Sequence, residues 1–172
     1  MSRNEVLEHA LAYTALGWFV LPLTPKDKTP FTRLAPRGFK SASNDPRQAL
    51  EWFGKRPDLN IGIACAMSGL VVYDIDFRNG GTNDGLDPTL IIKTGNGFHY
   101  YYEATNGFTY PGKLRNGIDI KFNGYVVAAP SIHPSGCKYQ RISDLMPQTP
   151  GKNLEKLVKK FDIEKVFQKK KN

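Results

Sequence analysis

Cysteine is scarce in this sequence, which contains only Cys65 and Cys137 among its 172 residues. Two cysteines without CxxC spacing are too few for a cysteine-rich zinc site, so that class of metal domain is excluded. The pair would form either a disulfide or two free thiols, and we expect two buried free thiols.

Long hydrophobic runs are also absent. No apolar stretch approaches the about 20 residues that a membrane-spanning helix needs, and the first residues contain no apolar core of the signal-peptide type. We therefore expect a cytoplasmic protein with no membrane partner.

Negative charge is in short supply, because 24 Lys and Arg face 16 Asp and Glu and give a net charge of +8. The excess is uneven: residues 152–172 hold eight lysines against Glu155, Asp162 and Glu164, and the rest of the chain carries +3. Such a charge is compatible with a polyanionic partner but specifies no activity. We expect one domain over residues 1–150, followed by a C-terminal helix and lysine-rich tail over residues 151–172.

Two helices are predicted in the first third of the chain. The first begins at a capping box formed by Ser2 and Glu5 and ends at Gly17. The second opens with Asp45-Pro46, where the acid caps the helix and the proline suits its first turn.

The segment "WFVLPLTP" between these helices is predicted to be a short buried strand that its prolines end. A basic loop without secondary structure is expected over residues 24–44, and loops of this length are usually functional or mobile.

Strand patterns dominate after residue 59. Six short segments rich in β-branched and aromatic residues are separated by Gly, Asn or Pro: "IGIACAM", "LVVYDIDF", "TLIIKT", "FHYYYEA", "GIDIKF" and "YVVAAP". With the two helices and a further helix from residue 153, these segments predict an α+β or α/β fold.

Two carboxylates interrupt the apolar run "GLVVYDIDFRNGG". Positions two apart in a strand share a face, so Asp74 and Asp76 point one way while Val71, Tyr73 and Ile75 point into the core. Neighbouring carboxylates repel unless a cation lies between them, and Mg²⁺ or Mn²⁺ takes such oxygens together with water and phosphate. The pattern alone also allows two solvated acids on an exposed strand face.

A third acid, Asp119, lies in "GIDIKF" on the same strand face as Lys121. Three acids from two strands at one site would suit two-metal phosphoryl transfer. A structural ion pair between Asp119 and Lys121 is equally compatible with the sequence.

Two histidines lie in segments that favour ligand binding. His99 follows the Gly-rich turn of "KTGNGFHYYYE", where glycines would let the backbone approach a phosphate. His133 lies with Ser131 in the proline-bracketed loop "PSIHPSG". Taken singly, each histidine is more often structural than functional.

In this order, the segments resemble the primase–polymerase domains of the archaeo-eukaryotic primase superfamily, especially the bifunctional DNA primase/polymerase group of plasmids, phages and other mobile elements. The resemblance covers about residues 10–140 and rests on four segments. These are "GWFVLPLTPKDKTP", "NIGIACAMSGLVVYDIDFRNGG", "TGNGFHYYY" and "GIDIKFNGYVVAAPSIHPSGCKY".

The resemblance implies a primase-like α+β catalytic domain over residues 1–150, with an RRM-like mixed β-sheet flanked by helices, and a C-terminal helix after it. The sequence departs from the family between Asp76 and His99. Relatives often carry a helix there, whereas "RNGGTNDGLDP" indicates a loop. A parallel crossover usually needs a helix, so the topology of this part stays open.

The resemblance also implies roles for particular residues. Three acids would bind two Mg²⁺ or Mn²⁺ ions and act in catalysis: Asp74, Asp76 and Asp119. Four residues would bind the nucleotide: His99, Lys121, Ser131 and His133. Basic residues of the loop over 24–44 would hold template or triphosphate, or else be solvated: Lys26, Lys28, Arg33, Arg37 and Lys40. Asn60 matches a recurrent position, and we assign it no role from the sequence.

The implied reaction is attack of a 3′ hydroxyl on the α-phosphate of a nucleoside triphosphate, with pyrophosphate leaving. We predict a template-dependent DNA polymerase that acts on single-stranded or primed DNA in a prokaryotic cell or in the host of a phage or plasmid. Whether it also primes stays open, because the sequence shows no zinc-binding insertion, helicase motif or helical priming domain. A helicase or helical priming domain in the same or another chain is the expected partner.

Two alternatives remain from sequence. A metal-dependent nuclease would use the same acids. A non-catalytic single-strand-binding module would use the basic tail and the run Tyr100–Tyr102 as stacking surfaces.

Overall fold

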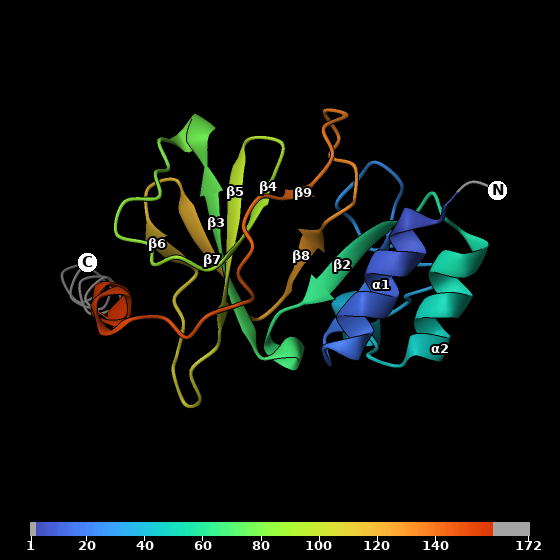
Figure 1. The fold of residues 1–172 in the computed structure, drawn as a ribbon, viewed down its shortest axis with the longest axis horizontal. Helices are drawn as coiled ribbons and strands as arrows, with labels where there is room; N and C mark the ends of the chain where they lie inside the picture. Colours follow the sequence, from blue (N-terminus) through green and yellow to red (C-terminus); the bar gives the residue numbers. More distant parts are fainter. Residues whose placement is uncertain (1–2, 160–172) are drawn as a thin grey trace, which may run out of the picture.

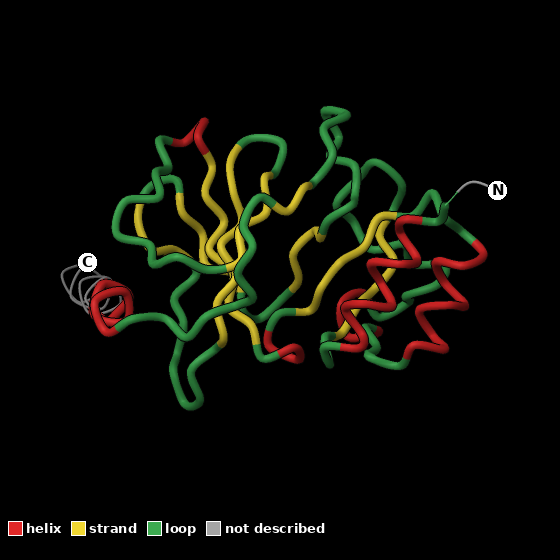
Figure 2. Tube along the Cα trace, viewed as in Figure 1, coloured by secondary structure: helices red, strands yellow, loops and turns green. Residues whose placement is uncertain are grey.

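The structure is a computed structural model that describes residues 3–159. The two N-terminal helices lie at one side of the molecule, and most strands lie in its other part (Figure 2). The helical elements are α1 (Glu5–Ala15), η1 (Gly38–Ser41), α2 (Pro46–Ala49), η2 (Leu50–Gly54), η3 (Ala66–Ser68) and η4 (Phe77–Asn79). The strands are β1 (Phe19–Leu23), β2 (Asn60–Ala64), β3 (Leu70–Asp76), β4 (Leu90–Lys93), β5 (Gly97–Glu103), β6 (Lys113–Arg115), β7 (Ile118–Lys121), β8 (Tyr125–Ala128) and β9 (Gln140–Arg141).

The strands form two sheets, which confirms the α+β class. The small sheet has the order β1-β2-β8, and the large sheet has the order β6-β7-β3-β5-β4-β9. The expected single mixed sheet is wrong for the described residues, because every pairing between these strands is antiparallel. The chain from β3 to β4 contains the short turn η4 and a loop, and β4 pairs beyond β5 instead of beside β3. Without a crossover helix, no parallel neighbour forms here.

Helix α1 packs against β1 and β2 of the small sheet, and α2 lies beside α1 (Figure 1). The N-cap of α1 is Asn4, whose side-chain oxygen accepts a hydrogen bond from the Leu7 N–H at 3.0 Å. The predicted cap, Ser2, lies outside the described residues. The second helix begins as expected, with Asp45 accepting from the Arg47 N–H, and continues from α2 into the π-helical turn η2.

The predicted buried strand after α1 is confirmed as β1, but Pro22 does not end it. Strand β1 continues through Pro22 to Leu23, since β1 is an edge strand of the small sheet and an edge tolerates a missing N–H. The following loop is ordered by backbone bonds: the Thr24 N–H donates to the Thr29 carbonyl, and Ser43 exchanges two bonds with Val20, all at 2.9 Å. The expectation of a structureless loop over residues 24–44 is therefore wrong.

The large sheet is buried on both faces, and this arrangement places the carboxylates. On its outer face, Val71, Tyr73 and Ile75 belong to one hydrophobic cluster. On its inner face, Leu70 and Val72 belong to a second cluster, which includes the small sheet. Asp74 and Asp76 follow Val72 on this inner face, where the apolar packing between the sheets stops.

The predicted C-terminal helix is present over residues 152–159. Leu154 and Val158 are buried in the outer cluster with Tyr73, so this helix covers the outer face of the large sheet. The lysine-rich tail after residue 159 lies outside the described residues.

Both cysteines are free, and Cys65 is buried as expected, whereas Cys137 is exposed. The prediction of two buried thiols is thus wrong for Cys137, which lies in the turn after His133. In the part of the chain that the structure describes, no helix has the length and apolar character to cross a membrane.

Candidate active site

Three ionisable side chains form one row across the middle of the large sheet. In register, Asp119 of β7 lies opposite Asp74 of β3, and Asp74 lies opposite His99 of β5. Directly opposed residues of antiparallel strands share a face, so the row lies on the inner face. The His99 Nε2 atom is 3.4 Å from the Asp74 Oδ1 atom.

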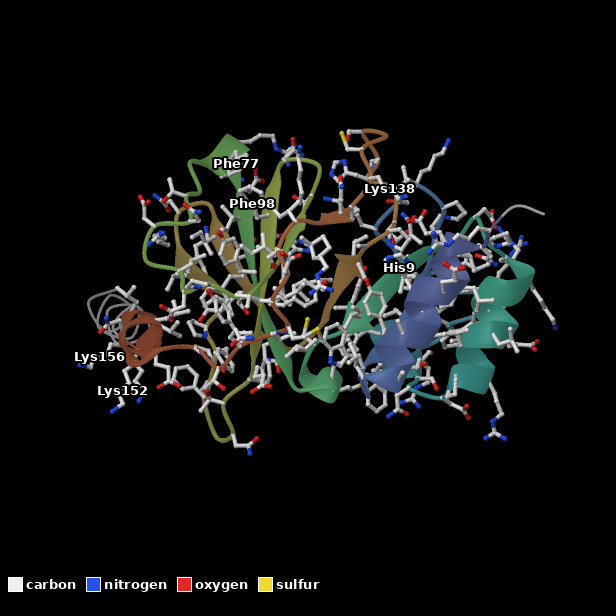
Figure 3. All side chains as sticks on the ribbon, in the orientation of Figure 1. His9, Phe77, Phe98, Lys138, Lys152 and Lys156 are labelled. Atoms are coloured by element: carbon white, nitrogen blue, oxygen red, sulfur yellow. The ribbon has the colours of Figure 1, made fainter. Side chains whose placement is uncertain are left out.

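Two members of the row, Asp74 and His99, line two neighbouring cavities. Both cavities share Lys28, Asp74, His99 and Tyr139 in their walls. The larger has a volume of about 310 Å³ and is completed by Lys121 and three residues of β8: Tyr125, Val126 and Val127. The smaller adds residues from the end of β3, from the turn before β5 and from the loop after β8: Ile75, Asp76, Arg78, Thr94, Asn96 and His133. Phe77 and Phe98, which are labelled in Figure 3, mark this end of the large sheet.

Asp74 is held as a carboxylate by its neighbours. Burial raises the pKa of its carboxyl, but the hydrogen bond from His99 and the positive charges near it, including those of Lys121 and Lys28, bring this pKa below its ordinary value. Asp74 is therefore ionised at neutral pH. An ionised carboxylate among cationic groups is suited to a ligand that carries both a cation and phosphates.

The side chain of Asp76 caps the helical turn η4. Its carboxylate accepts hydrogen bonds from the Arg78 backbone N–H at 2.9 Å and from the Asn79 side chain at 3.1 Å. The Arg78 guanidinium also contacts it, at 3.3 Å, and these bonds from Arg78 lower the pKa of the Asp76 carboxyl. The backbone here is fixed by two glycines in close contact, since a Cβ on Gly81 would lie 2.4 Å from the Gly117 carbonyl oxygen.

His133 lines the smaller cavity. Its Nδ1 accepts from the Ser135 backbone N–H at 3.0 Å, so in the neutral ring the proton is on Nε2. Burial lowers the pKa of the imidazole, and Lys28 and Arg78 lower it further. Its ring packs against Gly95, where a Cβ would lie 2.5 Å from the ring. Gly95 thus makes room for His133, whereas the sequence suggested that this turn approaches a phosphate.

The structure brings some predicted residues to the cavities and not others. Lys28 and Lys121 line them. Ser131 is buried, and its hydroxyl accepts from the Ile61 N–H at 2.8 Å, so it anchors the loop to β2. Lys26 lines a separate cavity.

Lys40 is exposed on η1. Within residues 3–159, Asp119 does not line either of the two cavities, although it lies beside Asp74 in the sheet.

Sequence reasoning missed several residues of the cavity walls: Arg78, Thr94, Asn96, Tyr125 and Tyr139. Arg78 follows Asp76 by two positions, and an arginine so close to an acidic motif is a signal that could have been used. Tyr139 carries no such signal, because its position depends on the return of the chain between the sheets.

The carboxylates of Asp74 and Asp76 fit one hard divalent cation. Mg²⁺ is usually bound by one or two carboxylates, with water and phosphate as its other ligands, and both acids line the smaller cavity. Among the described residues, no three His, Cys, Asp or Glu side chains are grouped to hold a metal by themselves. Within the same residues, the buried His99 Nδ1 finds no hydrogen-bond partner in the protein, an uncommon state that suits a ligand-binding position.

One protein family matches the chain. The family model described as "Bifunctional DNA primase/polymerase, N-terminal" matches residues 10–154. No curated protein matches the chain.

Proposed function

We propose that this chain, which belongs to the bifunctional DNA primase/polymerase family, is a template-dependent nucleotidyltransferase whose reaction takes place between its two sheets. The observation that carries the proposal is the pair Asp74 and His99 in the wall of a cavity that also contains two lysines. Asp119 lies opposite Asp74 in the neighbouring strand. The proposed reaction joins a 3′ hydroxyl to the α-phosphate of a nucleoside triphosphate and releases pyrophosphate.

The triphosphate is proposed to bind among the positive groups of the cavities. Lys28 and Lys121 supply charge, and the Nε2–H of His133 supplies a neutral donor. Cavities of about 300–1,000 Å³ are typical of small-molecule sites, and the larger cavity lies in this range. Fixed positive groups around phosphates stabilise the charge that develops during phosphoryl transfer.

Asp74 and Asp76 are proposed to hold Mg²⁺ or Mn²⁺. When bound, such an ion neutralises phosphoryl oxygens and assists the displacement. The chain contributes two ionised carboxylates, and His99 Nε2 contacts the Asp74 carboxylate at 3.4 Å. A role of Asp119 in holding a second ion stays a prediction.

The alternatives receive different support. A nuclease would use the same acids, and family membership favours the polymerase. The binding module loses one of its two sequence arguments, because Tyr100, Tyr101 and Tyr102 are between 0% and 5% exposed and cannot stack on bases. Priming, a helicase or priming-domain partner, a mobile-element origin and a cytoplasmic location remain predictions.

A primer-extension assay tests the proposal. The protein is given a primed single-stranded template, Mg²⁺ or Mn²⁺ and either set of nucleotides, and an unprimed template tests priming. Asp74→Ala should abolish extension, whereas Asp144→Ala, which removes an exposed acid, should leave it unchanged. Shortened primers in the absence of nucleotides would indicate the nuclease, and equal extension by parent and Asp74→Ala would refute the proposed site.

A further inference from the structure

Asn60, at the start of β2, is buried and joins two loops that come from distant parts of the sequence. Its Nδ2 donates to the Asp27 carbonyl at 2.9 Å and to the Ile132 carbonyl at 2.8 Å. Its Oδ1 accepts from the Ile132 N–H at 2.9 Å. One amide thus makes three hydrogen bonds while its residue is 2% exposed.

The chain neighbours of these partners are residues of the site. Asp27 precedes Lys28, which lines both cavities, and Ile132 precedes His133, which lines the smaller one. Each loop has one further attachment in addition to Asn60. The Tyr125 hydroxyl donates to the Lys28 carbonyl at 2.7 Å, and the Ser131 hydroxyl accepts from the Ile61 N–H, as described above. Asn60 is the one described side chain that bonds to both loops.

The chemistry of these contacts requires an amide. A primary amide provides two N–H donors and one carbonyl acceptor, and Asn60 uses both kinds of group. Aspartate has the same shape but would bring a negative charge against two carbonyl oxygens, and alanine would leave the partners of a buried site without their bonds. Buried polar groups that lose their partners are costly, so the loops would move to reach water.

We propose that Asn60 is a positioning residue for the triphosphate: it holds Lys28 and His133 at a fixed separation across the site. It contacts neither cavity described for the site and acts only through the two loops. This inference rests on the proposed function, because it assigns the pocket to a triphosphate.

The test measures binding of a nucleoside triphosphate, without extension, to folded variants of the whole chain. Asn60→Ala should weaken binding by about tenfold or more, the usual cost of losing aligned charge-assisted bonds. The matched control is Asn4→Ala. Asn4 also bonds two backbone groups, of Phe53 and Leu7, but neither belongs to the site, so binding should change by less than about twofold. If Asn60→Ala does not fold, Asn60→Ser, which keeps a small polar side chain but cannot make all three bonds, takes its place.

A double-mutant cycle separates positioning from general loss of structure. If Asn60 acts through Lys28, the effect of Asn60→Ala should shrink to less than about threefold in a Lys28→Ala background, since coupled residues are not additive. Equal effects in both backgrounds, or unchanged binding by folded Asn60→Ala, would overturn the inference.

Amide hydrogen exchange provides a readout that does not depend on nucleotide. The N–H groups of Ile132 and His133 are hydrogen-bonded in the loop, so Asn60→Ala should speed their exchange while α1 amides stay unchanged. If the parent binds no triphosphate, the proposed function fails, and unchanged exchange at these two amides would separately show that Asn60 does not hold the loop.

Discussion

Gly95→Ala should disturb the site through His133. A Cβ at position 95 would lie 2.5 Å from the His133 Cγ and Nδ1 atoms and 2.6 Å from Cε1. Ordinary contacts of this kind are about 3.5–4 Å, so the ring or the turn must move by about 1 Å. The ring cannot yield easily, because Nδ1 is bonded by the backbone and hydroxyl of Ser135.

The expected cost follows from this geometry. Overpacking of a tight contact costs about 1–3 kcal/mol, which urea unfolding would measure. A displacement of about 1 Å at a site can lower the rate by up to about 100-fold, which primer extension would measure. Gly112→Ala is the matched control, since nothing lies within 4 Å of its added Cβ, and both stability and rate should stay close to those of the parent.

The double variant Gly95→Ala/His133→Ala identifies the cause. Without the imidazole the added methyl has space, so Gly95→Ala should cost little further stability in this background. If the stability loss of Gly95→Ala is the same with and without His133, the collision is not with this ring, and the account of the turn is refuted.

Three further predictions concern charge, thiols and packing. The pKa of the Asp74 carboxyl is lowered in the folded state. The ionised carboxylate therefore contributes stability above about pH 4, and this contribution is lost as the pH falls through the folded pKa. Urea unfolding should show that Asp74→Asn loses less stability than the parent between neutral and acidic pH. Burial raises the pKa of Cys65 to about 12. After treatment with a thiol reagent near neutral pH, mass spectrometry should find the adduct on exposed Cys137 only. A rapid adduct on Cys65 in the native state would contradict this prediction. Leu154→Ala should lower the free energy of unfolding by about 2–5 kcal/mol, whereas Leu157→Ala, at a residue 39% exposed, should change it by less than about 0.5 kcal/mol.

The local part of the site could be predicted from the sequence. The two-residue period of a strand placed Asp74 and Asp76 on one face, because that period follows from the backbone. The register could not be predicted in the same way. Asp119 lies opposite Asp74 only because β7 pairs with β3, and such pairing depends on the whole sheet.

Long-range contacts also explain the errors. The loop over residues 24–44 is ordered by bonds from Asn60 and Ser43, whose partners are distant or unmarked in sequence. The Gly-rich turn accommodates His133, which comes from a loop more than thirty residues later. Strands β6 and β9 were missed because "KLR" and "QR" are too short to show a period.

The most direct test of the account is a crystal structure with Mn²⁺ and a non-hydrolysable nucleoside triphosphate. We expect anomalous density for the ion at the carboxylates of Asp74 and Asp76, and the triphosphate beside Lys28, Lys121 and His133. An ion or triphosphate bound elsewhere on the chain, with the space between the sheets unchanged, would contradict the assignment of the active site.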